Sequence, residues 1–257
     1  MSKITNGVIK NGIKIGYATV ISTDLLKAGH AIPYVSYKPT SITIHETDCP
    51  DVSAKTIYKS LSNANVDTTR AKASFQITVD ADNIRQCVNL LRTCWHAGDA
   101  TGNKTSIGIE ICQYSKDKEK QKKAYQNTAE LVKILKSELG IKKVYRHYDW
   151  TKKNCPSYML NKKYSGLTWD WFTNLLTTKQ YKQLLNGDYN KKYKVISNTL
   201  NVREARPDKN GNLAKVKFVL KEGAIVEVGY VYNGWASIWV EGDMGYINTS
   251  NKYITLL

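Results

Sequence analysis

The sequence predicts two folded units: a larger α/β unit with a mixed central sheet flanked by helices, followed by a small all-β unit. Short apolar runs typical of buried strands alternate with helical patterns through the first two thirds of the chain. From residue 193 onward, only short strand-like segments with frequent turn residues follow. The length of 257 residues also exceeds the usual size of one domain. We therefore assign residues 1–178 to the first unit, 179–192 to a linker and 193–257 to the second unit.

The first unit is predicted to begin with a lead-in over residues 1–40, interpreted as a loop that packs on the domain. A buried strand is expected at 41–47, because Ile42 and Ile44 alternate with polar residues. Helices are expected at 51–63, at 116–139 and at 168–176. The second has apolar residues at three- and four-residue spacing and Gly140 as its stop signal.

The linker is predicted from its polar composition and from the turn signal of Asn186, Gly187 and Asp188. Beyond it, the strands of the second unit are expected at residues 193–195, 200–203, 216–220, 225–228, 235–240 and 245–247.

Three residues with metal-binding side chains stand at the ends of short apolar runs. His45 and His147 each end a predicted strand, and Cys155 follows eight residues after His147. Zinc accepts imidazole nitrogen and thiolate sulfur together, and three protein ligands leave a fourth position for water. A single histidine after a strand is, however, more often structural than a ligand, and no local metal motif of the CxxC or HExxH kind is present. The three residues alone leave both interpretations open.

Further motifs lie between these anchors, at residues 73–80, 94–99 and 103–111. In order, the chain reads Ile-x-Ile-His, Ser-Phe-x-x-x-Val-Asp, Trp-His-Ala-Gly, Asn-x-x-Ser-Ile-Gly-Ile-Glu, His and Lys-x-Cys-Pro. This order resembles the type 2 N-acetylmuramoyl-L-alanine amidases, relatives of the animal peptidoglycan-recognition proteins. The resemblance runs from about Ile42 to Tyr158. It implies that His45, His147 and Cys155 ligate a catalytic zinc ion.

The resemblance also implies roles for residues around the zinc. Glu110 matches the carboxylate that polarises the zinc water, and Lys153 matches the lysine that stabilises the oxyanion. Trp95 and His96 match a wall of the substrate cleft. Many phage members carry histidine where this chain has Gln76, which is expected to offer an amide to the substrate instead.

The residues themselves agree with the role of Glu110. It lies between Ile109 and Ile111, so that in a strand its carboxylate points away from those two side chains. The simpler alternative is a polar residue on an exposed strand face. A carboxylate beside a metal can accept a proton from water and return it to a leaving amine.

The second unit, with Leu-Asn-Val-Arg at 200–203, Gly223, a tryptophan-containing strand and Gly-Tyr-Ile at 245–247, resembles a bacterial SH3-like domain. In phage lysins such modules hold the enzyme on the cell wall. The alternative for its aromatic residues is that they only fill a small barrel core. These residues are Tyr230, Tyr232, Trp235 and Trp239.

Charge and composition limit the partners. The formal net charge is +16, which favours a polyanionic partner. The basic residues are scattered and form no recognisable nucleic-acid-reading motif, so bacterial peptidoglycan with its anionic wall polymers is favoured over nucleic acid. No apolar run approaches a membrane span, and membrane insertion is not expected.

The cellular location is expected to be the host bacterial cytoplasm until release to the wall. The N-terminal residues lack the basic-then-apolar pattern of a secretory signal. The five cysteines show no paired spacing, so thiols are expected.

The combined hypothesis is a zinc amidase of the phage endolysin or autolysin type, cutting between N-acetylmuramic acid and L-alanine. One alternative is a non-catalytic peptidoglycan-binding protein, since family members that lose the third ligand bind without cutting. A basic nucleic-acid-binding protein has only the charge in its favour. The sequence does not indicate an oligomeric state.

Overall fold

The computed structural model describes residues 2–177, 191–240, 242–250 and 252–257. The chain divides into two compact units, Met1–Thr178 and Lys179–Leu257. The predicted linker, 179–192, lies outside the described residues apart from its last two positions, which begin a strand. Each unit is described by itself below.

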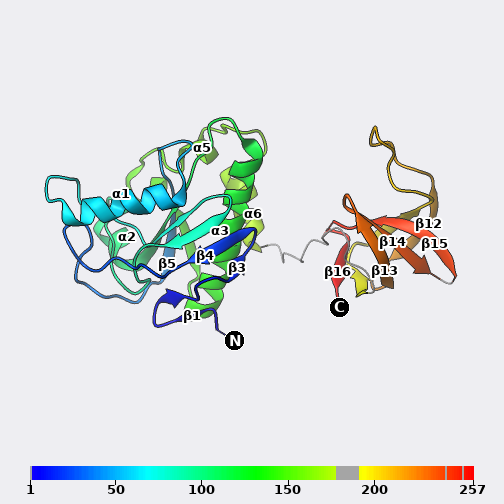
Figure 1. Cartoon of the computed structure of the whole chain (residues 1–257), viewed down its shortest axis with the longest axis horizontal. Helices are drawn as coiled ribbons and strands as arrows, with labels where there is room; N and C mark the ends of the chain where they lie inside the picture. Colours follow the sequence, from blue (N-terminus) through cyan, green and yellow to red (C-terminus); the bar gives the residue numbers. More distant parts are fainter. Residues whose placement is uncertain (1, 178–190, 241, 251) are drawn as a thin grey trace. The chain divides into compact units, whose positions relative to one another are not determined.

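The first unit is built on a mixed seven-stranded sheet with the order β3-β4-β7-β6-β8-β5-β9 (Figure 1). The strands are β3 (Lys14–Ile15), β4 (Ala18–Ile21), β5 (Ser41–Glu46), β6 (Ile77–Val79), β7 (Asn83–Gln86), β8 (Ser106–Ile111) and β9 (Lys143–Arg146). Strands β6, β8, β5 and β9 run parallel to one another, whereas β3 pairs antiparallel with β4 and β6 with β7. The predicted mixed α/β class is confirmed.

The lead-in is more ordered than the sequence suggested. It holds a two-stranded hairpin, β1 (Ile4–Thr5) and β2 (Val8–Ile9), and it contributes β3 and β4 to the main sheet. The interpretation of residues 1–40 as a loop was wrong for this part. Strands of two to four residues are too short to show a period, although Ile9, Ile15 and Val20 are buried.

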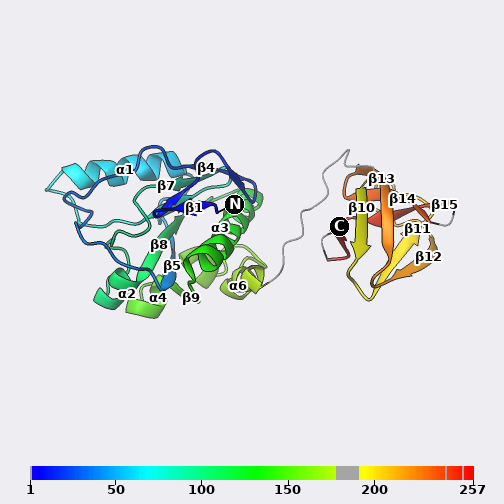
Figure 2. The ribbon, with the colours of Figure 1, turned by 90° about the horizontal axis from the view of Figure 1, so that it is seen from below.

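The helices are α1 (Ala54–Val66), α2 (Ala100–Thr105), α3 (Lys118–Leu139), α4 (His147–Thr151), α5 (Ser157–Leu160) and α6 (Trp169–Thr177). Helix α3 begins at the Asp117 cap, whose side chain accepts from the Lys120 amide, and ends at Gly140 with φ of +70°. Such a left-handed residue is the usual helix stop. Helices α3 and α6 pack together on one face of the sheet, and α1 covers the other (Figure 2).

The two faces of β5 and β8 carry different side chains. The isoleucines of both strands are buried in the core that faces α3. The alternate residues share the opposite face, where His45 pairs in register with Glu110 and Thr43 with Gly108. The buried apolar face fixes the register of the two strands, so the opposite face can hold polar side chains.

The second unit is an all-antiparallel sheet with the order β12-β11-β15-β14-β13-β10-β16. Its strands are β10 (Lys191–Val195), β11 (Thr199–Arg203), β12 (Val216–Lys221), β13 (Ile225–Tyr232), β14 (Trp235–Val240), β15 (Asp243–Asn248) and β16 (Ile254–Leu256). The first six contain the six strands expected from the sequence, and β16 was missed. The buried core is mostly aliphatic, with Tyr193 its largest member.

Three of the four aromatic residues of β13 and β14 are exposed and do not fill that core, whereas Trp235 is partly buried. Trp239 is 59% exposed, Tyr230 48% and Tyr232 49%. The core-filling alternative is therefore wrong for these three side chains. Among the described residues, no helix combines the length and the apolar character needed to cross a bilayer.

Candidate active site

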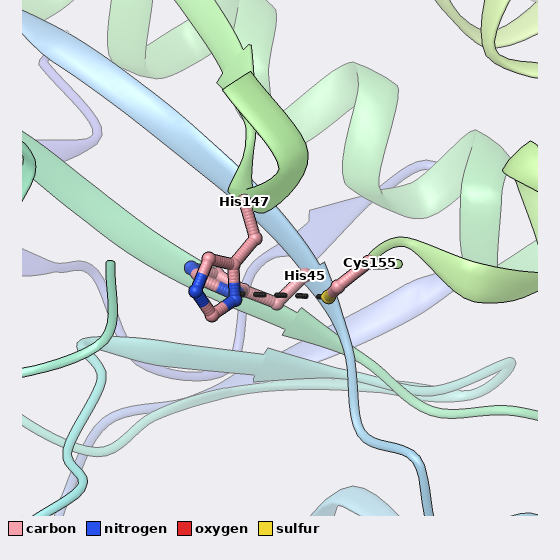
Figure 3. Close-up of side chains that lie close together, drawn as sticks. All are labelled: His45, His147 and Cys155. Atoms are coloured by element: carbon pink, nitrogen blue, oxygen red, sulfur yellow. Dashed lines mark hydrogen bonds between the residues drawn. The ribbon is translucent and has the colours of Figure 1, made fainter. Parts of the chain in front are cut away.

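Three side chains from separate segments converge at one end of the sheet (Figure 3). His45, His147 and Cys155 each offer one atom that could ligate a metal, and these three atoms lie within 4.8 Å of one another. The Nδ1 atoms of the two histidines are 3.0 Å apart, and the Cys155 sulfur is 3.9 Å from Nδ1 of His45. All three residues are buried.

Parallel strand pairing brings these side chains together. His45 is the last but one residue of β5, and His147 directly follows β9, which pairs with β5. Carboxyl ends of parallel strands meet at the same edge of a sheet, where α/β proteins commonly bind ligands. Cys155 lies in the loop between α4 and α5, held by a bond from the Tyr148 amide to its carbonyl and by contact of its sulfur with the Glu46 amide.

Hydrogen bonds define which histidine nitrogens carry protons. Nε2 of His96 lies 3.1 Å from the Ser106 carbonyl, which can only accept, so this nitrogen donates. In a neutral ring the other nitrogen, Nδ1, then accepts, and it lies 3.0 Å from Nε2 of His45. His45 must donate there, which leaves its Nδ1 as an acceptor that faces Nδ1 of His147 at 3.0 Å and the Cys155 sulfur at 3.9 Å.

His147 presents the same kind of lone pair. Its ring donates to the backbone of Ala97, a contact that acts to raise the ring's pKa. Nε2 is the nitrogen beside this segment, 3.6 Å from the Cβ position that a side chain at Gly98 would occupy. Nδ1 of His147 therefore faces Nδ1 of His45 as a second acceptor, 3.0 Å away.

Two facing acceptors with a sulfur beside them fit a cation. Burial lowers the pKa of all three histidine rings, that of His96 to about 4, and so favours their neutral forms; the other two are His45 and His147. Two neutral acceptor nitrogens cannot hydrogen-bond to each other. A nitrogen–nitrogen–sulfur set matches the ligand preference of zinc. Burial raises the pKa of the Cys155 thiol to about 12, with the nearby Glu110 adding to the rise. A bound cation would favour the thiolate instead.

Glu110 stands beside this cluster on the neighbouring strand. Its Oε2 atom is buried and has no hydrogen-bond partner within the described chain. Burial raises the pKa of this carboxyl to about 8, while the charge of Lys153 acts to lower it. A carboxyl group with an unpartnered oxygen and a pKa near neutrality is suited to accepting and returning a proton.

The cluster opens into a cleft of about 490 Å³. Every site residue predicted from the sequence lines this cleft except Gln76. Lys153 is exposed at its edge, and Trp95 forms part of its wall with the Lys72 ammonium 5.5 Å from the ring centre.

Gln76 does not line the cleft and has no exposed surface. Its Nε2 donates to the Arg92 carbonyl at 2.8 Å and to the Tyr37 hydroxyl at 3.2 Å. Its Oε1 accepts from the Gly108 amide at 2.7 Å. The amide expected to meet the substrate is used instead to hold the backbone of β8.

Glu46 is a site residue that sequence reasoning missed. Its carboxylate accepts from the Tyr158 amide at 2.6 Å, from Gln113 and Ser157, and from the Tyr125 hydroxyl on α3. It thereby ties the segment that follows Cys155 to β5. The available signal was a carboxylate directly after His45, at a position where the alternation of Ile42 and Ile44 predicts an apolar side chain.

Comparison with known proteins identifies the family. Residues 36–158 match the family model described as N-acetylmuramoyl-L-alanine amidase. Among curated relatives, the amidase CwlA of a Bacillus species is 34% identical over 55% of this chain and 54% of its own. The amidase XlyA of Bacillus subtilis is 35% identical over 54% of this chain and 45% of its own. The chain thus spans about half the length of these relatives.

Solved structures show the same relationship for the first unit. The catalytic domain of XlyA aligns with a TM-score of 0.53 and 31% identity, covering 62% of this chain and 99% of that domain. A mutant endolysin from Bacillus subtilis aligns with the same score, identity and coverage. The match covers the site described above, and this chain belongs to the N-acetylmuramoyl-L-alanine amidase family.

Proposed function

We propose that this protein is a zinc-dependent peptidoglycan hydrolase that cleaves the amide between N-acetylmuramic acid and L-alanine of the stem peptide. The observation that carries the proposal is the pair of facing histidine lone pairs with a thiol beside them, next to an unpartnered carboxyl group in an open cleft. His45, His147 and Cys155 would hold the zinc. The family membership supplies the reaction class.

An amide is a poor electrophile, so the nucleophile must be better than bulk water. Zinc, when bound, supplies a Lewis acid that lowers the pKa of water toward about 7. Glu110 takes the proton of the attacking water and returns it to the departing amine of L-alanine. Its burial suits both steps, because a pKa raised toward neutrality lets the same group accept and donate.

Lys153 stabilises the negative charge that develops on the carbonyl oxygen. Its position at the cleft edge supports this role, as does the electrostatic influence of its ammonium on Glu110 and His147. A positive charge fixed before the reaction begins is among the strongest catalytic contributions. Trp95 offers a flat apolar surface in the same cleft for a sugar ring or peptide.

We further propose that the second unit is an SH3-like module that binds the cell wall. Its support is an outward sheet face rich in aromatic side chains: Trp239 pairs with Met244 across β14 and β15, and both are exposed. The Arg206 guanidinium lies 4.6 Å from the Tyr246 ring centre on this sheet. Exposed aromatic clusters of this kind commonly mark binding surfaces.

The net charge of +16 supports anionic wall polymers as additional partners. A role as a phage endolysin fits this combination of a hydrolase site with a wall-binding module. The rival function, binding peptidoglycan without cutting it, is disfavoured because the third ligand position carries Cys155 within reach of both histidines.

Mass analysis of digested peptidoglycan tests the bond that is cut. Purified walls are incubated with the zinc-loaded protein and with Glu110→Gln as the inactive match. We expect new alanine amino termini and intact sugar chains from the wild type only. New reducing sugars would identify a glycosidase, and unchanged walls with bound protein would identify the non-catalytic rival.

A further inference from the structure

We propose that His96 is a positioning residue for the metal ligand His45: it holds that ring in the Nε2-protonated tautomer and so aims the Nδ1 lone pair at the metal position. The inference rests on the proposed zinc site. It gives His96 a function different from that of a cleft wall, because the ring acts on the metal through another residue.

The direction of each hydrogen bond follows from one fixed acceptor. The Ser106 carbonyl accepts from Nε2 of His96 at 3.1 Å, and it also accepts from the Tyr37 hydroxyl at 2.8 Å. His96 therefore has only Nδ1 to offer to His45, as an acceptor at 3.0 Å. Without this acceptor, either nitrogen of His45 could carry the proton, and the Nδ1-protonated form cannot bind a metal through that atom.

The position of the His96 ring is fixed from several sides. The Asn103 side-chain oxygen accepts from the backbone amides of His96 and Ala97, at 2.9 and 2.8 Å. The ring lies against β8 at Gly108, where an added Cβ would approach its Cγ to 2.6 Å. Only glycine leaves this space, and the Gly108 amide is held in turn by Gln76.

A residue that only formed part of the cleft wall would not need these hydrogen bonds and packing contacts. His96 is 8% exposed, and both of its nitrogens are used inside the protein. The geometry matches the general arrangement in which a ligating histidine bonds a second group through its other nitrogen, fixing tautomer and ring orientation. Loss of such a partner commonly weakens metal binding by about 10- to 100-fold.

The test measures zinc affinity of the full-length protein by competition with a chromophoric chelator. His96→Phe keeps a ring but removes both nitrogens, and we expect zinc to bind about 10- to 100-fold more weakly. His96→Asn places an oxygen near the Nδ1 position, and we expect it to recover most of the lost affinity. Trp95→Phe, the matched control on the same cleft wall, should leave zinc affinity unchanged even if it lowers turnover.

Cobalt substitution gives a second readout that does not depend on activity. The visible absorption of bound Co²⁺ should change in His96→Phe, because the orientation of His45 changes, and should be retained in Trp95→Phe. Equal zinc affinity and equal cobalt spectra in wild type and His96→Phe would overturn the proposal.

A measurement on the unmutated protein covers the case in which His96→Phe fails to fold. Long-range proton–nitrogen NMR correlations of the histidine rings should place a proton on Nε2 of His96 and none on its Nδ1. A proton on Nδ1 of His96 would overturn the inference. A wild-type protein that binds no zinc would instead remove the proposed metal site while leaving this hydrogen-bond assignment testable.

Discussion

At the residue scale, the chemistry of the site follows from three acceptor atoms that the described chain leaves without an N–H or O–H donor. The Nδ1 lone pairs of His45 and His147 face each other, and Oε2 of Glu110 is buried without a donor in the described chain. Buried polar atoms in folded proteins are otherwise almost always paired. Three such atoms around one cleft indicate a site completed by something that the chain does not supply.

Glu110 should contribute stability to the zinc-free protein that is lost as the pH rises. The pKa of its carboxyl is about 8 in the folded chain, against about 4.3 in an unfolded one. At this group the folded state therefore binds more protons between these values, and its contribution to stability is lost as the pH rises through that window, by at most about 1.4 kcal/mol per pH unit.

Urea unfolding in excess chelator from pH 4.5 to 8 measures this effect. The stability of wild type relative to Glu110→Gln should fall across this range, whereas its stability relative to Glu119→Gln, an exposed change on α3, should stay constant. The buried histidines His45, His96 and His147 have lowered pKa values and act in the opposite direction, but they do so equally in all three proteins. Parallel curves for wild type and Glu110→Gln would show that the carboxyl is not held in its protonated form.

At the scale of elements, Glu46 joins three segments around the metal position. Its carboxylate at the end of β5 receives the Tyr125 hydroxyl from α3 and the Tyr158 amide from α5. The backbone amide of the same residue contacts the Cys155 sulfur at 3.4 Å. The third ligand is thus positioned by the packing of α3 and α5 on the sheet as well as by its own loop.

Tyr125→Phe should destabilise the first unit more than the removal of another hydrogen-bonded tyrosine hydroxyl, that of Tyr164. It removes a buried hydrogen bond to a carboxylate, which contributes about 1.5–3 kcal/mol. Tyr164→Phe removes a bond to the neutral Tyr114 carbonyl and should cost about 0.5–1.5 kcal/mol. Urea unfolding compares the two variants, and equal losses would argue against a charged Glu46.

The sequence predicted elements whose signal is local. Helix α3 was found from its spacing and from Gly140, and the two histidines from the strands that precede them. The role of Gln76 could not be found in this way, because its partners Tyr37 and Gly108 are each more than thirty residues away. Glu46 was missed for the same reason, and β1 to β4 because strands so short show no period.

At the scale of the whole molecule, both units carry a net positive charge, but only the first contains the residues of the proposed catalytic site. Residues 1–190 hold 28 of the 38 basic and 16 of the 22 acidic residues. Every residue of the proposed catalytic site lies in this part, and each unit has its own hydrophobic core. Catalysis and wall binding should therefore be separable.

Truncation after Asn190 should leave zinc binding and hydrolysis of a small soluble muropeptide nearly unchanged. Activity on intact walls should fall, because tethering raises the effective concentration of the enzyme at its substrate. The remaining wall activity should depend more strongly on salt, since it relies on attraction between charges. A folded, zinc-loaded truncation that fails on the soluble substrate would show that the second unit completes the active site.

The most direct test of the zinc-amidase account measures zinc content and release of alanine amino termini together in three proteins: wild type, Glu110→Gln and Cys155→Ser. We expect one zinc and full release for wild type, one zinc with most release lost for Glu110→Gln, and loss of both for Cys155→Ser. Full zinc occupancy in Cys155→Ser, or near-normal release by Glu110→Gln, would contradict the account.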